Sequence, residues 1–255
     1  MNKKADVVIV GTGVAGLFSA LNLPDDKEII MITKSDAESS DSFLAQGGIC
    51  VLRDEEDYDS YFEDTMRAGH YENRKESVDI MIRSSGKIIE DLVGYGVEFE
   101  KDGEAFAYTR EGAHSRPRIL FHADVTGKEI TSKLLARVRE KNNVTIYEYT
   151  TMTDILEENG KCAGITVKTK SGEESSIYAD YTILASGGIG GLYQHSTNFP
   201  HLTGDALEVA KKHHIRLEHL DYVQIHPTTL YSEKPGRRFL ISESVRGEGA
   251  LLYNK

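Results

Sequence analysis

The apolar residues of the first part of the chain follow a strand–helix–strand rhythm. Residues 7–10 form an uninterrupted β-branched run, which is typical of a strand that is buried on both faces. Residues 17–23 have the apolar content of a short helix that Pro24 ends, and residues 28–33 form a second apolar run. This order predicts a βαβ unit in which the two strands lie parallel.

Further along the chain the apolar spacing changes twice. Residues 54–95 are predicted to be mostly helical because apolar positions recur there at near-helical spacing, and residues 126–141 form another predicted helix. Between residues 144 and 184 polar and apolar positions alternate, with hairpin-turn sequences at residues 158–160 and 171–172. This alternation predicts strands that are joined by short turns.

These elements together predict the fold class. Residues 181–186 return to a buried strand that ends at Gly187-Gly188, and residues 205–213 have the pattern of a helix. We therefore expect an α/β, Rossmann-like fold. Its doubly wound parallel sheet should carry an antiparallel β insertion near residues 145–180. The segment after His219 is expected to be rich in loops, with some strand.

Composition narrows the class of protein. The chain has 255 residues and a net charge of -11, which argues against a nucleic-acid partner because phosphate binding needs clustered Lys and Arg. Its two cysteines, Cys50 and Cys162, are far apart, so we expect no disulfide scaffold and no metal site. The N-terminal apolar stretch is too short for a signal peptide, and no run of about 18 apolar residues occurs. A cytoplasmic protein without membrane association is expected.

A glycine-rich turn follows the first strand. Its sequence is Gly11-Thr12-Gly13-Val14-Ala15-Gly16. In this pattern the first glycine allows a tight turn, the second lets the backbone approach a pyrophosphate, and the third lets helix and strand pack closely. The six residues therefore predict a dinucleotide site at a helix N-terminus. Thr33-Lys34 stands where an NAD site usually has an acidic residue, which disfavours an NAD-dependent dehydrogenase.

The loop after the second strand carries a family resemblance. Its sequence is Ser39-Ser40-Asp41-Ser42-Phe43-Leu44-Ala45-Gln46-Gly47-Gly48. It resembles the loop that wraps FAD in the succinate dehydrogenase/fumarate reductase flavoprotein family, to which the Thr33-Lys34 pair is also similar. Some members link FAD covalently to a histidine of this loop, at the position that Asp41 occupies here. The resemblance implies non-covalent FAD, bound by Thr33, Lys34 and residues 40–48.

A second segment is similar to the L-aspartate oxidases within this family. It reads Thr109-Arg110-Glu111-Gly112-Ala113-His114-Ser115, with Arg118 and an Asp124-Val125-Thr126-Gly127 run downstream. A buried ammonium group without a counter-charge is costly or loses its proton. The resemblance implies that Glu111 supplies this counter-charge to the amino group of the substrate, a need that a succinate enzyme does not have.

Two later segments complete the resemblance. Ala185-Ser186-Gly187-Gly188 and Thr203-Gly204-Asp205 resemble a strand end and a helix start that bind FAD, although a simple N-cap would explain Asp205 as well. Gln224-Ile225-His226-Pro227-Thr228 and Ser242-Glu243-Ser244-Val245-Arg246 resemble the segments that hold the substrate carboxylates. The resemblance thus implies FAD-binding roles for Ser186, Gly187 and Asp205, and catalytic roles for His226, Ser242, Glu243 and Arg246.

The resemblance also implies a function. We expect FAD-dependent oxidation of L-aspartate to iminoaspartate with oxygen or fumarate as the acceptor. This reaction is the first step of de novo NAD (quinolinate) biosynthesis, with quinolinate synthase as a metabolic partner. One alternative is a soluble fumarate reductase or succinate dehydrogenase flavoprotein, which shares most of these motifs. The other is an inactive FAD-binding module.

The domain organisation follows from the same resemblance. Residues 1–221 are expected to form the FAD-binding domain, and residues 222–255 the beginning of a capping domain over the substrate. Family members are longer than this chain. The rest of the capping domain, a helical domain, a proton-transferring arginine and a second substrate-binding histidine are therefore expected beyond Lys255.

Overall fold

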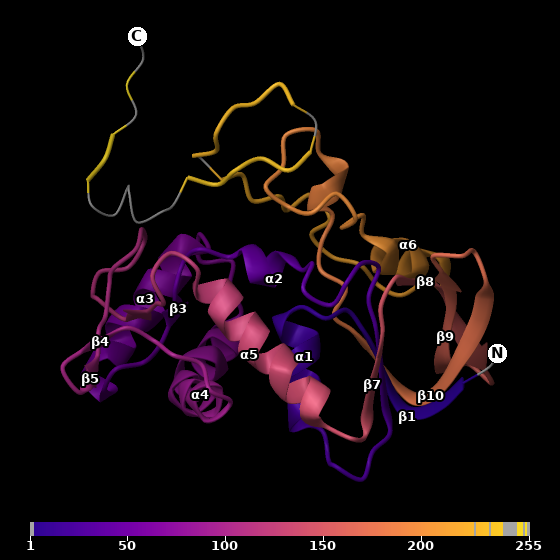
Figure 1. The fold of residues 1–255 in the computed structure, drawn as a ribbon. Coiled ribbons are helices and arrows are strands. Elements are labelled where there is room, and N and C mark those ends of the chain that lie inside the picture. The colour runs from indigo at the N-terminus through magenta and orange to yellow at the C-terminus, as the bar shows by residue number, and fades with distance from the viewer. Residues whose placement is uncertain (1–2, 227, 235, 242–248, 252, 254–255) are drawn as a thin grey trace. The chain divides into compact units, whose positions relative to one another are not determined.

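The computed structural model describes residues 3–226, 228–234, 236–241, 249–251 and 253 (Figure 1). The chain forms two compact units. The sheet unit comprises Met1–Phe43 and Leu134–Leu240, and the helical unit comprises Leu44–Lys133 and Ile241–Lys255. The predicted division at residues 221 and 222 concerns cofactor and substrate domains, and it stays a prediction.

A six-stranded mixed sheet forms the centre of the sheet unit, in the order β7-β2-β1-β10-β9-β8. The pairs β10–β1, β1–β2 and β2–β7 are parallel, whereas β8, β9 and β10 form an antiparallel meander. The predicted α/β fold is therefore confirmed. The bounds of the strands are β1 Lys3–Val10, β2 Ile29–Ile32, β7 Val144–Tyr147, β8 Thr150–Glu158, β9 Lys161–Thr169 and β10 Glu174–Leu184.

The antiparallel part begins later than predicted. β7 pairs with β2 in parallel, with Val144 opposite Ile29 and Tyr147 opposite Ile32, so it extends the parallel sheet instead of starting the insertion. The insertion therefore begins at Thr150. A run of four residues shows alternation, but alternation does not reveal which partner a strand will take or in which direction.

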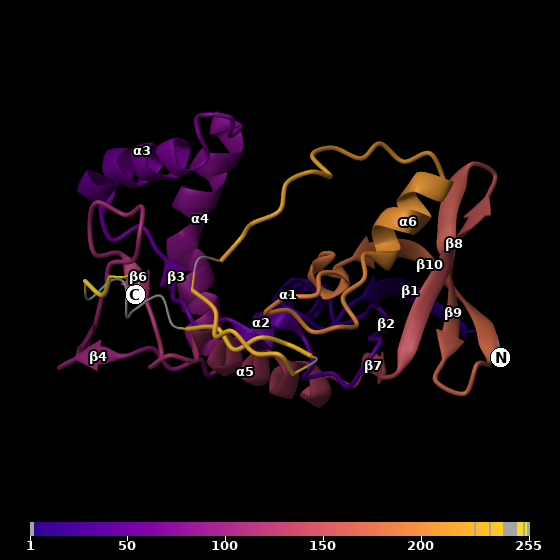
Figure 2. The ribbon, with the colours of Figure 1, turned by 90° about the horizontal axis from the view of Figure 1, so that it is seen from above.

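The core of the sheet unit lies between the sheet and its helices. Strand β1 is buried over Val7–Val10 and β2 over its whole length, as expected for strands covered on both faces. Helix α1 (Val14–Asn22) follows β1, and α6 (Asp205–Lys212) lies beside β8, as Figure 2 shows. Ala206 and Val209 of α6 join Met152 and Ile165 of the meander in one apolar cluster. The apolar side chains of α6 thus pack against one face of the sheet.

The helical unit is built around two long helices, α3 (Tyr58–Ala68) and α4 (Lys75–Gly94), preceded by the short helix η1 (Glu55–Asp57). Tyr61 and Met66 of α3 pack against Val78 and Ile82 of α4. Strands β3 (Ile49–Cys50) and β6 (Ile119–Leu120) form one antiparallel pair, and β4 (Lys101–Asp102) and β5 (Ala105–Phe106) form another. The predicted helical character of residues 54–95 is confirmed.

Three further helices occur among the described residues. Helices α2 (Asp41–Leu44) and α5 (Thr126–Glu140) each run from one unit into the other along the chain, and η2 (Gly190–Leu192) follows β10. Among the residues that the structure describes, no helix has both the length and the apolar character needed to cross a membrane. After α6, the described residues contain one isolated bridge, between Thr229 and Leu240.

Two glycines give a matched test of this packing. Gly164 in β9 has φ +132°, and a Cβ there would lie 2.0 Å from the carbonyl oxygen of Ile177 on β10. Gly164→Ala should therefore lower the free energy of unfolding by about 2 kcal/mol or more, measured by urea denaturation. Gly86 lies inside α4, where an added Cβ would meet no atom within 4 Å. Gly86→Ala should raise the same quantity by up to about 1 kcal/mol. Equal effects of the two changes would contradict the packing at β9–β10.

Candidate functional site

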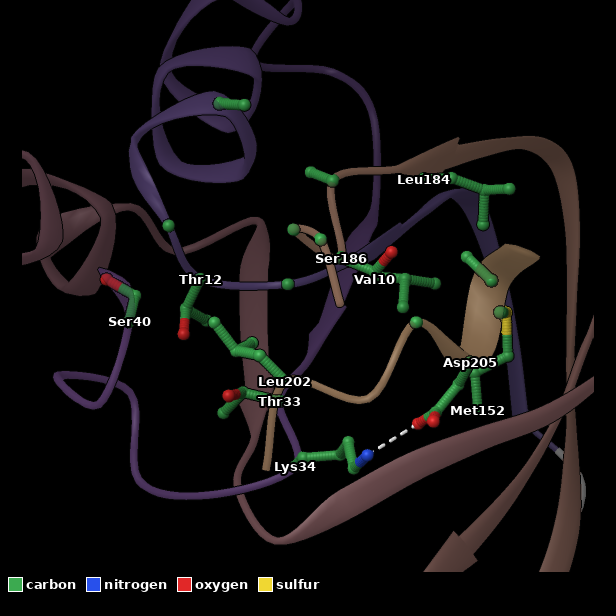
Figure 3. Close-up of a pocket in the computed structure, with 18 of the residues that line it drawn as sticks. Val10, Thr12, Thr33, Lys34, Ser40, Met152, Leu184, Ser186, Leu202 and Asp205 are labelled. Atoms are coloured by element: carbon green, nitrogen blue, oxygen red, sulfur yellow. Dashed lines mark ion pairs between the residues drawn. The ribbon is translucent and has the colours of Figure 1, made fainter. Parts of the chain in front are cut away.

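A pocket of about 570 Å³ lies in the sheet unit, where β1, β2 and β10 reach their carboxyl ends (Figure 3). Ligands of open α/β sheets bind at this edge. Most of the predicted cofactor-binding residues of the sheet unit line this pocket. They are Gly11, Thr12, Gly13, Val14, Ala15, Thr33, Lys34, Ser40, Asp41, Ser42, Ser186, Gly187 and Asp205. The sequence motifs thus converge on one cavity of the size that takes a small-molecule ligand.

The glycine-rich turn lies against the end of β10. Gly11 has φ +115°, and a Cβ there would lie 2.2 Å from the carbonyl oxygen of Ala185. Gly16 stands behind the turn, outside the pocket lining, and its Cβ would lie 2.2 Å from the carbonyl oxygen of Gly11. Glycine is therefore needed at both positions for packing alone, as predicted for the first and third glycines of the pattern.

The N-terminus of α1 faces this pocket without an acidic residue in its first turn. Gly13 is the N-cap and brings no side-chain cap of its own, while the Val14 amide donates to Ser42 Oγ at 3.1 Å. A helix N-terminus carries partial positive charge and amide donors, which favour an anionic group such as a pyrophosphate. Gly13, Val14 and Ser42 therefore form a suitable cradle for the phosphates of a dinucleotide.

Lys34 and Asp205 meet across the pocket (Figure 3). The Lys34 ammonium lies 2.7 Å from an Asp205 carboxylate oxygen and donates to Thr203 Oγ1, also at 2.7 Å. Thr203 Oγ1 in turn donates to Asp205 at 2.7 Å. The N-cap of α6 is Gly204, with φ +71°, and Asp205 lies in the first turn of the helix and lines the pocket. Asp205 is therefore not the N-cap residue of α6, and its role in binding FAD stays a prediction.

Asp41 fastens two loops that line the pocket. Its carboxylate accepts hydrogen bonds from the Phe199 amide, at 3.0 Å, and from Asn198 Nδ2. Nearby, His201 Nε2 donates to the carbonyl oxygen of Ser39 at 3.0 Å. Asp41 therefore has a structural role within the sheet unit. That it leaves FAD without a covalent link stays a prediction.

Several pocket residues were not predicted from the sequence. They form a largely apolar wall and come from β8, the end of β10 and the segment around α6: Thr150, Met152, Leu184, Leu202, Ala206, Leu207, Ala210, Ile215 and Leu217. Met152, for example, belongs to an alternating strand, where every second residue is apolar whether or not a cavity lies beside it. The sequence contains no separate signal for these positions.

Glu111 contacts the glycine pair of the predicted FAD loop within the helical unit. The Gly48 amide donates to Glu111 Oε1 at 3.0 Å, and a Cβ on Gly47 would lie 3.3 Å from the same oxygen. Gln46 Oε1 is buried and has no hydrogen-bond partner among the described residues. The other predicted residues of the FAD loop are divided between the two units. Phe43 lies in the sheet unit, where its amide donates to the Ser40 carbonyl oxygen at 3.0 Å, and Leu44 and Ala45 lie in the helical unit.

A fully buried arginine, Arg118, follows the Glu111 segment in the chain. Asp57 accepts from its Nε at 3.0 Å and from its Nη2 at 2.8 Å, and Asp64 accepts from its Nη1 at 2.7 Å. Burial alone would raise the pKa of Asp64, but hydrogen bonds from Ser115 and Arg118 outweigh it and lower the pKa to about 2. Neither aspartate was predicted, because acidic residues early in a helix are usually solvated.

Of the remaining predicted catalytic residues, the structure describes His226. His226 lies in the sheet unit, outside the pocket lining, and is half-buried. The Thr228 amide donates to His226 Nδ1 at 3.2 Å, so a neutral His226 carries its proton on Nε2. Ser242, Glu243 and Arg246 lie outside the described residues. Their roles, like that of His226, stay predictions.

Comparison with known proteins identifies the family. A family model described as FAD binding domain matches residues 6–255. The chain belongs to this FAD binding domain family. The prediction of FAD as the cofactor is therefore confirmed, and the pocket at the ends of β1, β2 and β10 fits it: amide donors at the start of α1 suit phosphates, and the apolar wall suits rings.

The relatives agree with the resemblance that the motifs indicated. L-aspartate oxidase of Clostridium perfringens is 48% identical over all 255 residues, and that of Clostridium acetobutylicum is 44% identical across the whole chain. The chain covers 58% and 59% of these two proteins, so it spans less than two thirds of their length. A quinol fumarate reductase of E. coli matches with a TM-score of 0.90 and 26% identity, over 100% of this chain and 44% of that one.

The attachment of α6 to the sheet gives a test by pH. Asp154 on β8 pairs with Lys212 and, at 2.7 Å, with His213 Nε2, both at the end of the helix that carries Asp205. The hydrogen bond from Lys212 is the main cause that lowers the pKa of Asp154 to about 2, below its usual 3.8. A carboxyl group whose pKa is lower in the folded state stabilises the fold at pH values above its pKa in the unfolded state. This contribution is lost as the pH falls through the pKa of the folded state.

Asp154→Asn should therefore lower the free energy of unfolding by about 1 kcal/mol at pH 6, since the pair is partly exposed. The difference between the two proteins should shrink as pH falls from about 4 towards 2, where the native carboxyl is protonated as well. Urea denaturation at several pH values measures this. A difference that stays constant down to pH 2 would contradict the assignment.

Proposed function

We propose that this chain is the FAD-binding part of an L-aspartate oxidase, an enzyme that converts L-aspartate to iminoaspartate. The observation that carries the proposal is the hydrogen bond from the Gly48 amide to Glu111. It joins an anion to the backbone of the loop that is similar to FAD loops of the family. The 48% identity with the L-aspartate oxidase of Clostridium perfringens over the whole chain supports the same activity.

FAD, when bound, supplies the two-electron acceptor for the oxidation of the carbon–nitrogen bond. In this proposal Gly13, Val14 and Ser42 hold its phosphates, and Lys34 and Asp205 bind its sugar-bearing end. The apolar wall that includes Met152 and Leu184 excludes water from its rings. These are contributions of binding and orientation, which the protein supplies while the cofactor supplies the redox chemistry.

The substrate is an amino dicarboxylate, so the site needs both cations and an anion. We assign the ammonium group to the Glu111 carboxylate, which is half-buried and oriented by the Gly48 amide. His226, with its proton on Nε2, is suited to donate to a substrate carboxylate. Arg246 and Ser242 complete this set in the proposal, since a guanidinium binds a carboxylate through two parallel hydrogen bonds. Glu243 belongs to the same segment.

The metabolic setting is proposed on the same basis. Oxygen or fumarate takes the electrons in the second half of the reaction. Iminoaspartate then enters quinolinate and NAD biosynthesis through quinolinate synthase, in the cytoplasm. A dicarboxylate without an amino group is the alternative substrate, because the fold matches a quinol fumarate reductase with a TM-score of 0.90. An FAD-binding module without activity is the third candidate.

Anaerobic reduction of the bound flavin distinguishes these candidates. The complete protein that contains this chain should lose its flavin absorbance on addition of L-aspartate and keep it on addition of succinate. Reduction by succinate but not by L-aspartate would assign the protein to the fumarate reductase branch. Binding of FAD without reduction by either compound would support the inactive module.

Glu111→Gln tests the role of the anion. The change keeps the shape and the acceptor of the Gly48 hydrogen bond and removes the charge. It should raise the apparent KM for L-aspartate about tenfold to a hundredfold, the value of a charge-assisted hydrogen bond, without altering the binding of succinate as a competitor. Steady-state kinetics measures both. An equal loss for the two ligands would refute the assignment of Glu111 to the ammonium group.

A further inference from the structure

The guanidinium of Arg118 has a hydrogen-bond acceptor for each of its five N–H groups. Asp57 accepts from Nε and Nη2, and Ser60 Oγ accepts a second bond from Nη2 at 2.8 Å. Asp64 accepts from Nη1 at 2.7 Å, and His114 Nδ1 lies 3.1 Å from the same nitrogen. A guanidinium offers five donors and no acceptor, so Arg118 is saturated and its orientation is fixed.

Arg118 also fixes the protonation of His114. Because Arg118 can only donate, His114 Nδ1 must accept and the ring carries its proton on Nε2, which lies 3.4 Å from Cys50 Sγ. Burial and the neighbouring Arg118 lower the pKa of His114, which keeps the ring neutral. The imidazole is thus held between the guanidinium on one side and the thiol on the other.

A short turn connects this cluster to Glu111. The His114 amide donates to the carbonyl oxygen of Glu111 at 3.3 Å, so the two residues are the ends of one turn, and Ala113 within it has φ +72°. The next residue, Ser115, donates to Asp64 Oδ2 from both its amide and its hydroxyl, each at 2.7 Å. One end of the turn is therefore tied to the buried cluster.

The other end of the turn carries the carboxylate that accepts from Gly48. The base of the segment is closed by the backbone bridge between Thr109 and Ile119. Glu111 is thus held by a backbone bridge before it, by a buried ion cluster after it, and by Gly48 at its own side chain. An alanine at positive φ is strained, and such strain persists only where the surroundings over-determine the backbone.

We propose that Arg118 is a positioning residue, which with Asp57 and Asp64 holds the turn 111–114 so that Glu111 is presented for the amino group of the substrate. The inference rests on the proposed function of Glu111 and extends it to the residues that set the preference for an amino dicarboxylate. Arg118 itself is completely buried, so we do not place it against the substrate. It acts through His114 and through Asp64 and Ser115.

Asp64→Asn in the complete FAD-loaded protein is the test. It removes one charge of the cluster and disturbs the contacts of Ser115, while Asp57 keeps its two bonds to Arg118. The dissociation constant of L-aspartate should rise about tenfold, the usual lower limit for the loss of a supporting partner, and the inhibition constant of succinate should not change. Asp79→Asn is the control, because it removes the charge of another aspartate of the helical unit, one that accepts from Arg83 at 2.8 Å and from the Tyr58 hydroxyl. It should change neither constant.

A double-mutant cycle separates positioning from simple loss of stability. If Asp64 acts through Glu111, the variant with both Glu111→Gln and Asp64→Asn should bind L-aspartate as weakly as Glu111→Gln alone. Losses that multiply, or an equal loss of L-aspartate and succinate binding in Asp64→Asn, would overturn the proposal. If Glu111→Gln alone leaves the preference for L-aspartate over succinate unchanged, the proposed function of Glu111 is wrong. This outcome is measured on the single variant, so it can be told apart from a failure of the role of Arg118 and Asp64.

Two further measurements keep the test valid if Asp64→Asn folds poorly. Ser115→Ala removes only the hydroxyl contact to Asp64, and it should shift L-aspartate binding in the same direction by about twofold to tenfold. Hydrogen exchange of the Gly48 amide reports the contact with Glu111 without any turnover. Its exchange should be faster in Ser115→Ala than in Asp79→Asn. Equal exchange in the two variants, with unchanged L-aspartate binding, would overturn the proposal.

Discussion

The lack of a side chain at Gly11 is the constraint on which the pocket depends. A Cβ there would lie 2.2 Å from the carbonyl oxygen of Ala185, well inside the closest approach of two atoms. With glycine at this position the Gly11 amide donates to Ile32, and the Ala185 amide donates to Val10, each at 2.9 Å. The ends of β1, β2 and β10 are therefore held at one edge, and the turn into α1 opens on that edge.

In the helical unit, buried charges instead of steric exclusion order the loop at residues 111–118. Among the described residues, the segment from Glu111 to Arg118 meets a neighbouring strand only at its end, where the Val51 amide donates to the Arg118 carbonyl oxygen at 3.0 Å. A buried charge cluster holds the segment. Taking Arg118, Asp57 and Asp64 out of water costs several kcal/mol for each ion, which the saturated hydrogen bonding of the guanidinium offsets. Removal of one partner from such a cluster costs about 3–5 kcal/mol, because it leaves an uncompensated buried charge. The end of this loop is thus tied to Asp64 by directional hydrogen bonds from Ser115 and Arg118.

The elements that could be predicted from the sequence are those with local causes. The turn at residues 11–16 and the hairpins of β8 to β10 follow from periodicity and turn residues within short windows. The parallel pairing of β7 with β2 was missed because it depends on a partner more than a hundred residues away in the chain. The candidate site shows the same division. Motif resemblance selected Glu111 but could not indicate its contact with Gly48. Asp57 and Asp64 lie in a pattern typical of an acidic, solvated helical face, because burial of a charge becomes visible only once its distant partner is in place.

The two sides of the pocket depend differently on ionic strength and pH. The Gly11 side is fixed by steric exclusion and backbone hydrogen bonds, which salt does not screen. The α6 side depends on ion pairs at both ends of the helix, Asp205 with Lys34 and Asp154 with Lys212, and on the contact between Asp154 and His213. Their signs also suit the helix dipole, with acidic residues in the first turn and basic residues in the last. Partly exposed pairs of this kind weaken with ionic strength and at low pH. High ionic strength or low pH will therefore weaken the contacts of α6 before those of the glycine-rich turn at residues 11–16.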